Sequence, residues 1–176
     1  MNGSISRCLA ELVREVFGSA TWDAIVDRAE SAAGTQQSLH IARSEVDDVE
    51  TLALIDATCK VLGVSLAEVA DLLGEYWCCV YAPDVHDVSW STIGSARECI
   101  EVLNEVHGRL SSSNPDVAPP RSLCDWRDDN TMHVEYKSER GLIDFYVGLV
   151  KGVGTALGEP LRVTKMTSSA VEVVFA

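Results

Sequence analysis

The sequence predicts an α+β fold: a helical N-terminal subdomain followed by a C-terminal antiparallel sheet with one or two packed helices. Apolar residues recur at helical spacing through the first two thirds of the chain, and they alternate with polar residues in parts of the last third. The chain has 176 residues, enough for one domain with a real core and few for two. We therefore expect one domain of mixed architecture.

The first two expected helices are amphipathic. Trp22, Ile25, Val26 and Ala29 predict the second helix over 20–32. The first helix is predicted by an apolar stripe that ends at Gly18 and consists of Ile5, Leu9, Leu12, Val13, Val16 and Phe17. The polar stretch 34–40 then indicates a loop.

Two further helices begin at capping boxes, in which a hydroxyl and a carboxylate satisfy the free N–H groups of the first turn. The boxes are Ser44-Glu45-Val46-Asp47 and Ser65-Leu66-Ala67-Glu68. They predict helices over 44–62 and 65–81, and Gly63 separates the two.

The rest of the chain changes character. Pro83 is expected to end the helix before it, and another helix is expected over 95–112, before a serine- and proline-rich stretch. Alternation and helical spacing then predict a strand over 132–138, a helix over 141–157, and strands over 161–166 and 171–175.

Charge and composition exclude several classes of partner. The net charge is −13, from 27 acidic and 14 basic residues, and such a field repels both nucleic acid and anionic lipid. No apolar run reaches the roughly 18–20 residues of a membrane span, and the N-terminus does not resemble a signal peptide. We expect a cytoplasmic protein that binds neither nucleic acid nor membrane.

The six cysteines do not form a recognisable framework. Cys78 and Cys79 are adjacent, and no C-x-x-C motif is present. We expect reduced thiols, with a structural zinc or a redox role as the alternatives.

His107 lies on the apolar face of the expected 95–112 helix. It follows Ile100 by seven residues and Leu103 by four, and it precedes Leu110 by three, so its imidazole points toward the core. It is either an ordinary core histidine, bonded to the backbone or a side chain, or the axial ligand of a metal held mainly by something else, such as a haem.

A second candidate is the run 136–140. Alternation places Tyr136, Ser138 and Arg140 on one face of a strand, with Lys137 and Glu139 on the other. A phenol, a hydroxyl and a guanidinium within about 13 Å of strand suit a ligand with one or two carboxylates. The alternative is an ordinary half-exposed strand.

Pro119-Pro120 is the third candidate. Two successive fixed φ angles make a stiff wall twelve and thirteen residues after His107, although such a pair also serves simply to stiffen a loop.

Together, these features resemble the haem-nitric oxide/oxygen binding (H-NOX) domain family over essentially the whole chain. The resemblance rests on Leu103 to His107, Pro119-Pro120 with Cys124 beyond, Tyr136-x-Ser138-x-Arg140, Thr21-Trp22-x-x-Ile25, Gly74-Glu75-Tyr76-Trp77 and Val147 to Gly152. The chain departs from the family at Asn2, where relatives often have tyrosine. It also departs at Gly108 and the serines 111–113, which are expected to loosen the end of the helix.

The resemblance implies a single H-NOX domain over 1–176, with haem b between a distal part of about 1–82 and a proximal part of about 83–176. The implied roles are the axial iron ligand for His107, propionate binding for Tyr136, Ser138 and Arg140, porphyrin distortion for Pro120, and the distal pocket for Ile5, Leu9, Trp77 and Phe145.

The implied distal residue Phe145 favours one gas. Family members that hold oxygen stably carry a tyrosine five residues after the motif's arginine, where this chain has Phe145. Bound oxygen carries partial negative charge and needs a hydrogen-bond donor, whereas bound NO depends much less on one. Tyr76, Tyr146 or the Trp77 indole are the alternative donors.

The function implied is therefore an NO sensor that also binds CO. NO binding would weaken or break the bond from His107 and so change the conformation of the protein. A separate histidine kinase or cyclic-di-GMP enzyme would recognise this change. The alternatives are reversible O2 binding and a haem-independent thiol or redox interaction module. We expect no enzymatic activity, because the sequence shows no catalytic triad, paired acids or phosphate loop.

Overall fold

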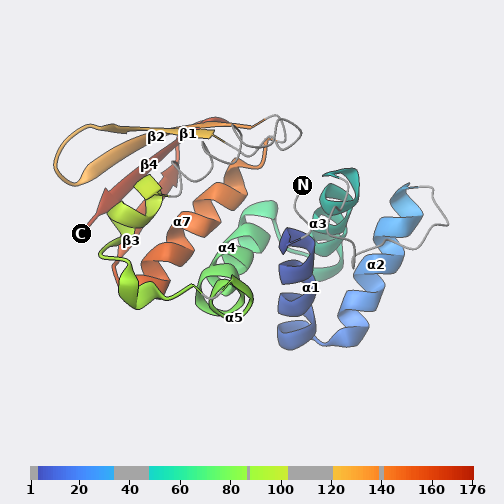
Figure 1. Ribbon diagram of the computed structural model, residues 1–176. Helices are drawn as coiled ribbons and strands as arrows, with labels where there is room; N and C mark the ends of the chain where they lie inside the picture. Colours follow the sequence, from blue (N-terminus) through green and yellow to red (C-terminus); the bar gives the residue numbers. More distant parts are fainter. Residues whose placement is uncertain (1–3, 34–47, 87, 103–120, 139–140) are drawn as a thin grey trace, which may run out of the picture. The chain divides into compact units, whose positions relative to one another are not determined.

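The structure is a computed structural model that describes residues 4–33, 48–86, 88–102, 121–138 and 141–176. Contacts divide the chain into two compact units, residues 1–69 and 70–176, and each is described by itself. Helices make up the first part of the chain, and the four strands follow with α7 between the second and third of them, which confirms the predicted α+β class (Figure 1).

The first unit is helical. Its helices are α1 (Ser4–Phe17), α2 (Ser19–Ala33) and α3 (Asp48–Leu62), and α2 packs against both of the others. The buried core consists of Leu9, Leu12, Val13, Trp22, Ile25, Leu54 and smaller side chains. A hydrogen bond of 3.0 Å joins the buried hydroxyls of Ser6 and Thr51 within this core. The first two helices therefore form as predicted, whereas the loop 34–40 and the first capping box lie outside the described residues.

The second capping box is confirmed. The backbone N–H and hydroxyl of Ser65 donate to the Glu68 carboxylate at 2.8 and 2.7 Å, and the Glu68 N–H donates back to the Ser65 hydroxyl at 3.3 Å. These bonds hold the pKa of Glu68 below its usual value. They open α4 (Leu66–Tyr76), after a left-handed turn at Gly63 with φ +69°.

The prediction that Pro83 ends this helical segment is wrong. The chain passes from α4 into a π-helical turn, η1 (Trp77–Tyr81), and directly into α5 (Ala82–His86). Pro83 is tolerated because it lies in the first turn of α5, where its missing N–H removes no α-helical bond. A 3₁₀ turn, η2 (Trp90–Thr92), comes after it.

The second unit is built on an antiparallel sheet in the order β1-β2-β4-β3. Its strands are β1 (Arg121–Trp126), β2 (Thr131–Lys137), β3 (Leu161–Lys165) and β4 (Ala170–Phe175). One face carries α7 (Ile143–Leu157), as Figure 1 shows. The residues buried between sheet and helix include Met132, Val134, Ile143, Val147, Val150, Val171 and Val173.

One strand, β1, differs from the sequence prediction, and the other boundaries move by one or two residues. In β1, the side chains that turn inward are Ser122, Cys124 and Trp126, while Leu123 on the outer face is 55% exposed. The inward positions combine a polar, a small and an aromatic side chain, and the outer face carries the apolar Leu123 beside the charged Asp125, so the apolar and polar residues of β1 do not alternate cleanly. The partner strand β2, rather than the local sequence, therefore determines β1.

Of the expected 95–112 helix, the structure describes residues 96–102 as helical. The Glu98 N–H donates to the Ser95 hydroxyl at 3.1 Å, so Ser95 caps this helix. Ala96 and Ile100 are buried, and Ile100 is the residue of the predicted apolar face that lies within the described part of this helix.

Candidate functional site

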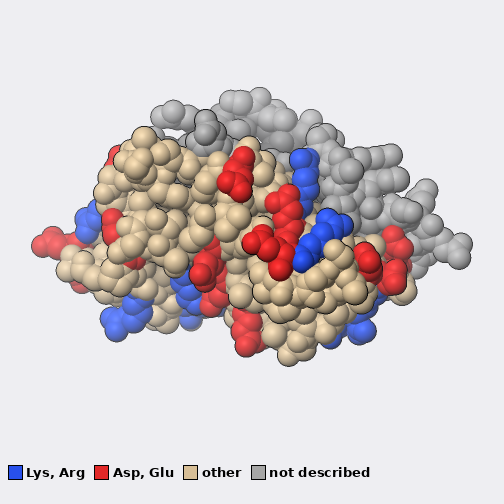
Figure 2. Space-filling view, turned by 90° about the horizontal axis from the view of Figure 1, so that it is seen from below, with Lys and Arg blue, Asp and Glu red and all other residues tan. Residues whose placement is uncertain are grey.

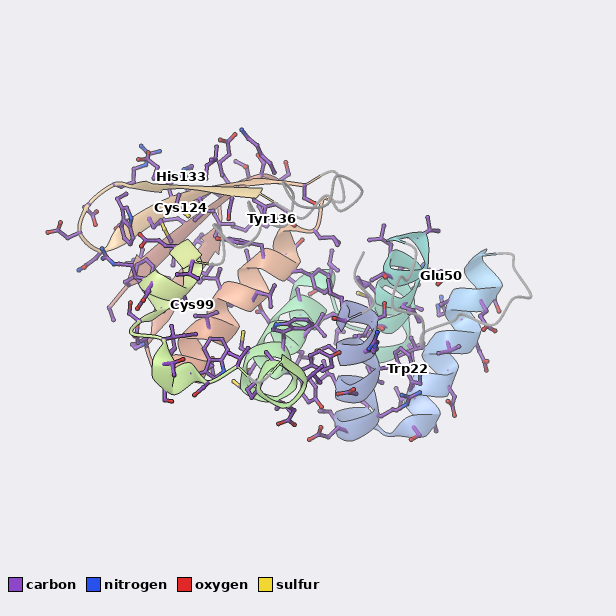
Figure 3. All side chains as sticks on the ribbon, in the orientation of Figure 1. Trp22, Glu50, Cys99, Cys124, His133 and Tyr136 are labelled. Atoms are coloured by element: carbon purple, nitrogen blue, oxygen red, sulfur yellow. The ribbon has the colours of Figure 1, made fainter. Side chains whose placement is uncertain are left out.

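The inner face of the sheet brings Tyr136 against Tyr146. Burial alternates along β2, so Tyr136 lies on the face that α7 covers, and Figure 3 shows it extending from β2 toward that helix. Its ring lies 5.3 Å from the Tyr146 ring at 40°. Both side chains are buried. Two phenols from different elements therefore meet in one apolar environment.

The Tyr146 hydroxyl is the unusual member of this pair. It is buried, and no partner in good hydrogen-bond geometry is found for it among the described residues. Burial raises the pKa of Tyr146 well above its ordinary value, the nearby Cys124 raises it further, and the Ser122 hydroxyl offsets part of the rise. A buried hydroxyl without a well-formed hydrogen bond is costly, so this position suits an additional donor or acceptor.

The predicted strand face extends only to Lys137. That side chain is exposed and pairs with Glu135 at 3.4 Å, opposite in direction to Tyr136 as alternation requires. Ser138 lies just past the strand, half-buried, and its carbonyl accepts from the Gly141 N–H in a turn. Alternation thus does not determine where Ser138 points, and Arg140 lies outside the described residues.

The helix described over 96–102 is fixed to the sheet at its start. The Arg97 guanidinium lies 3.8 Å from the centre of the Trp126 ring and 5.5 Å from that of Phe175. It also donates to the Asp129 carbonyl, and the Trp126 indole N–H donates to Glu101 at 3.1 Å. Stacked and hydrogen-bonded arginine is well suited to such an anchor.

A second attachment holds the beginning of the same helix. The Ala96 N–H donates to the Glu159 carboxylate, which lies just after α7, at 3.1 Å. The predicted site residues further along the chain, His107 and Pro120, lie outside the described residues. The structure therefore describes how this helix is anchored, and the roles of these two residues stay predictions.

The four expected pocket residues belong to different units. Ile5 is half-buried and Leu9 fully buried in the first unit. In the second, Phe145 is buried on α7, and Trp77 begins the π-helical turn with its ring 5.0 Å from that of Tyr81. Their grouping into one pocket stays an expectation of the family resemblance.

The cysteines range from buried, at Cys8 and Cys78, to exposed, at Cys79. None of the six is in a disulfide. Burial raises the pKa of Cys78 to about 12, and Cys79 and Cys99 contribute to the rise. Burial also raises the pKa values of Cys59, Cys79, Cys99 and Cys124. Because the thiolate is the reactive form, these environments disfavour redox chemistry.

Charged side chains of both signs lie on the face of the molecule in Figure 2. On the described part of the face in Figure 2, acidic and basic side chains are interspersed. Among the described helices, none is both long and apolar enough to cross a membrane.

Sequence reasoning missed three features that the structure makes prominent. The sequence indicated the Tyr146 hydroxyl only as an alternative donor to oxygen, whereas the structure buries it against Tyr136. Ser122 lies on the unpredicted strand, and the Trp90 indole donates to the Cys78 carbonyl at 2.7 Å. Only the spacing of Ser122, Cys124 and Trp126 carried a signal for β1, and it was weak.

Together, the fold and the buried phenols define an α+β domain with a polar group enclosed in its apolar core. A family model described as haem-NO-binding matches residues 2–165. The chain therefore belongs to the haem-NO-binding (H-NOX) family, a family of haem-based gas sensors.

Solved structures agree on the fold. The Fe(II) unliganded H-NOX protein from K. algicida is 19% identical, with a TM-score of 0.76 over 99% of this chain and 95% of that one. A mutant H-NOX protein from S. oneidensis in the Fe(II) ligation state is 14% identical, with a TM-score of 0.80 over 100% and 96%. The I5F mutant of T. tengcongensis H-NOX is 17% identical, with a TM-score of 0.76 over 99% and 97%.

The described residues fit the chemistry of a haem. Its propionates are carboxylates, and the buried phenol of Tyr136, together with Ser138 just past the strand, supplies neutral hydrogen-bond donors. The Tyr146 hydroxyl beside Tyr136 is a further polar group that a bound ligand or water would satisfy.

Proposed function

We propose that this chain is a nitric oxide sensor that holds haem b and signals to a separate enzyme. When bound, haem would supply a ferrous iron able to bind NO or CO. The proposed roles are iron ligation for His107, propionate binding for Tyr136, Ser138 and Arg140, contact with the porphyrin for Pro120, and the gas pocket for Ile5, Leu9, Trp77 and Phe145.

The observation that carries the choice of gas is the divergence of Phe145 and Tyr146 on α7. Neighbouring helical residues point about 100° apart. The Tyr146 ring packs on Tyr136 against the sheet, so its phenol belongs to that side of the helix. Phe145, at the family's distal position, offers no hydroxyl. This arrangement supports NO over O2, because only O2 depends strongly on a donor.

Signal transmission would use the helix expected over 95–112, on which His107 is predicted to lie. Its first turns are attached to the sheet through Arg97 and Ala96. A change in the tension on His107 would therefore act on a helix that is held at one end, which favours a discrete shift over general loosening. We propose that a histidine kinase or a cyclic-di-GMP enzyme in the cytoplasm reads this shift, and that the chain itself catalyses no reaction.

The proposed division of labour is a distal part of about 1–82 and a proximal part of about 83–176 within one domain. The thiol or redox module is the less favoured alternative, because burial raises the pKa values of five of the six thiols.

The test is the absorption spectrum of the purified ferrous protein under argon, CO, NO and air. We expect a Soret band, spectral shifts with NO and CO, and no stable oxygen spectrum in air. Absence of haem from protein expressed with ample haem would contradict the proposal and favour the thiol module.

Two variants separate the oxygen donors. Phe145→Tyr should raise oxygen affinity by about 10- to 150-fold, the equivalent of one charge-assisted hydrogen bond of roughly 1.5–3 kcal/mol. Tyr146→Phe, the matched control, should leave gas binding unchanged. If the wild type instead holds oxygen stably and Tyr146→Phe abolishes this, the protein is an oxygen binder with Tyr146 as donor.

A further inference from the structure

The π-helical turn η1 (Trp77–Tyr81) has an unusual hydrogen-bond pattern. The Ala82 N–H donates to the Trp77 carbonyl, five residues back instead of the usual four. Single π-turns inside helices are rare and frequently occur at functional sites. This turn contains Trp77, which the proposed function assigns to the gas pocket.

Pro83 interrupts this pattern at its next step. In the same five-residue spacing, the Cys78 carbonyl would accept from the N–H of residue 83, but proline has none. The Trp90 indole N–H donates to the Cys78 carbonyl instead, at 2.7 Å. A side chain seven residues beyond Pro83 thus replaces the donor that the proline lacks.

Trp77 packs against Tyr81 within this segment. Side chains four residues apart lie on the same side of a helical segment, and the rings of Trp77 and Tyr81 lie 5.0 Å apart at 32°, with Tyr81 buried. On the α7 side, the buried Cys78 thiol lies 3.7 Å from the Leu149 carbonyl.

We propose that Trp90 is a positioning residue for the gas pocket: its indole N–H completes the Pro83-interrupted π-turn and so fixes the orientation of Trp77. This inference rests on the proposed function for the placement of Trp77 in the pocket. The bond from Trp90 to Cys78 and the π-turn themselves do not depend on haem.

The experiment is a double-mutant cycle on the full chain. Trp90→Phe keeps an aromatic ring and removes the donor, whereas Pro83→Ala supplies a backbone N–H at position 83. The four proteins, wild type, both single variants and the double variant, are compared by thermal unfolding and by the C–O stretching frequency of the ferrous CO complex. Trp126→Phe, alone and with Pro83→Ala, is the matched control, because its indole N–H donates to Glu101 and not to the turn.

Trp90→Phe should lower Tm by about 2–8 °C in the wild-type background, as expected for one lost hydrogen bond in a chain of this size. In the Pro83→Ala background it should lower Tm by less than half as much, while Trp126→Phe has the same effect in both backgrounds. The C–O stretch should shift in Trp90→Phe and return toward the wild-type value in the double variant.

Equal losses of Tm from Trp90→Phe in both backgrounds would overturn the inference. If Trp90→Phe alone does not fold, a folded double variant supports the inference, and an unfolded one overturns it. If the Tm values couple as expected but the C–O stretch does not move, the turn is held as proposed and the placement of Trp77 in the gas pocket is wrong.

Discussion

Gly148 on α7 is a position where one methyl group tests the packing of the second unit. A Cβ added there would lie 2.5 Å from the carbonyl carbon of Ala70 and 3.1 Å from the backbone nitrogen of Asp71, both on α4. It would also overlap the Ala70 carbonyl oxygen. Ordinary contact begins near 3.4 Å, so Gly148→Ala requires the helices to separate by about 0.9 Å or more.

Two effects of opposite sign decide the magnitude. Alanine is favoured over glycine inside a helix by about 0.8–1.0 kcal/mol. Overpacking costs about 1–3 kcal/mol or more, and here the neighbour is helix backbone, which cannot rotate away as a side chain can. Lys151 and Asp71 form an ion pair of 2.7 Å across the same two helices. Because this pair is half-exposed, it adds little to the free energy of unfolding. We expect a net loss of about 2 kcal/mol, or about 4–8 °C in Tm.

The assay is thermal unfolding monitored by far-UV circular dichroism, with Gly94→Ala as the control. A Cβ at Gly94 meets only the far end of the flexible Glu98 side chain. Gly94→Ala should therefore change Tm by less than about 2 °C, consistent with an exposed surface substitution. A Tm for Gly148→Ala within this same range would refute the reasoning, since it would mean that α4 and α7 separate at little cost.

Three further outcomes are expected. Arg140→Ala should purify largely without haem, because losing one member of a buried ion pair costs about 3–5 kcal/mol. Glu139→Ala should retain haem, and equal haem content in the two variants would count against Arg140 as a propionate-binding residue. His107→Ala should lose haem unless imidazole is supplied, and an unchanged ferrous spectrum would exclude it as the iron ligand. Burial raises the pKa of Cys78 from 9.0 to about 12, so the folded state binds more protons than the unfolded state between these pH values. The free energy of unfolding should therefore fall as the pH rises above 9, by up to about 1.4 kcal/mol per pH unit. Cys78→Ala should remove more of this pH dependence than Cys79→Ala does.

Short-range rules were sufficient for the elements that the sequence predicted. The capping box at Ser65 and Glu68 is complete within four residues, and its three hydrogen bonds form as expected. Apolar spacing predicted α1, α2 and α7, and alternation predicted β2, β3 and β4 to within one or two residues. In each case the periodicity that buries one face is local, so neighbouring residues alone encode it.

The site was predicted less completely. Alternation correctly separated Tyr136 from Lys137, because that contrast depends only on position along one strand. It did not extend to Ser138, because the strand ends where the turn toward Gly141 begins. The roles of His107, Arg140 and Pro120 rest on the family resemblance.

Other features required the tertiary structure. Strand β1 presents Ser122 and Cys124 inward, and it forms a strand because β2 pairs with it along its whole length. Near Pro83, the Trp90 indole donates to the Cys78 carbonyl from outside the helix. The composition and local periodicity of this chain thus determined its fold class and most of its elements. Pairing with β2 decided β1, and the bond from Trp90 to Cys78 is likewise a tertiary one, because hydrogen bonds that a segment cannot satisfy internally must be satisfied by groups that only the folded chain brings near.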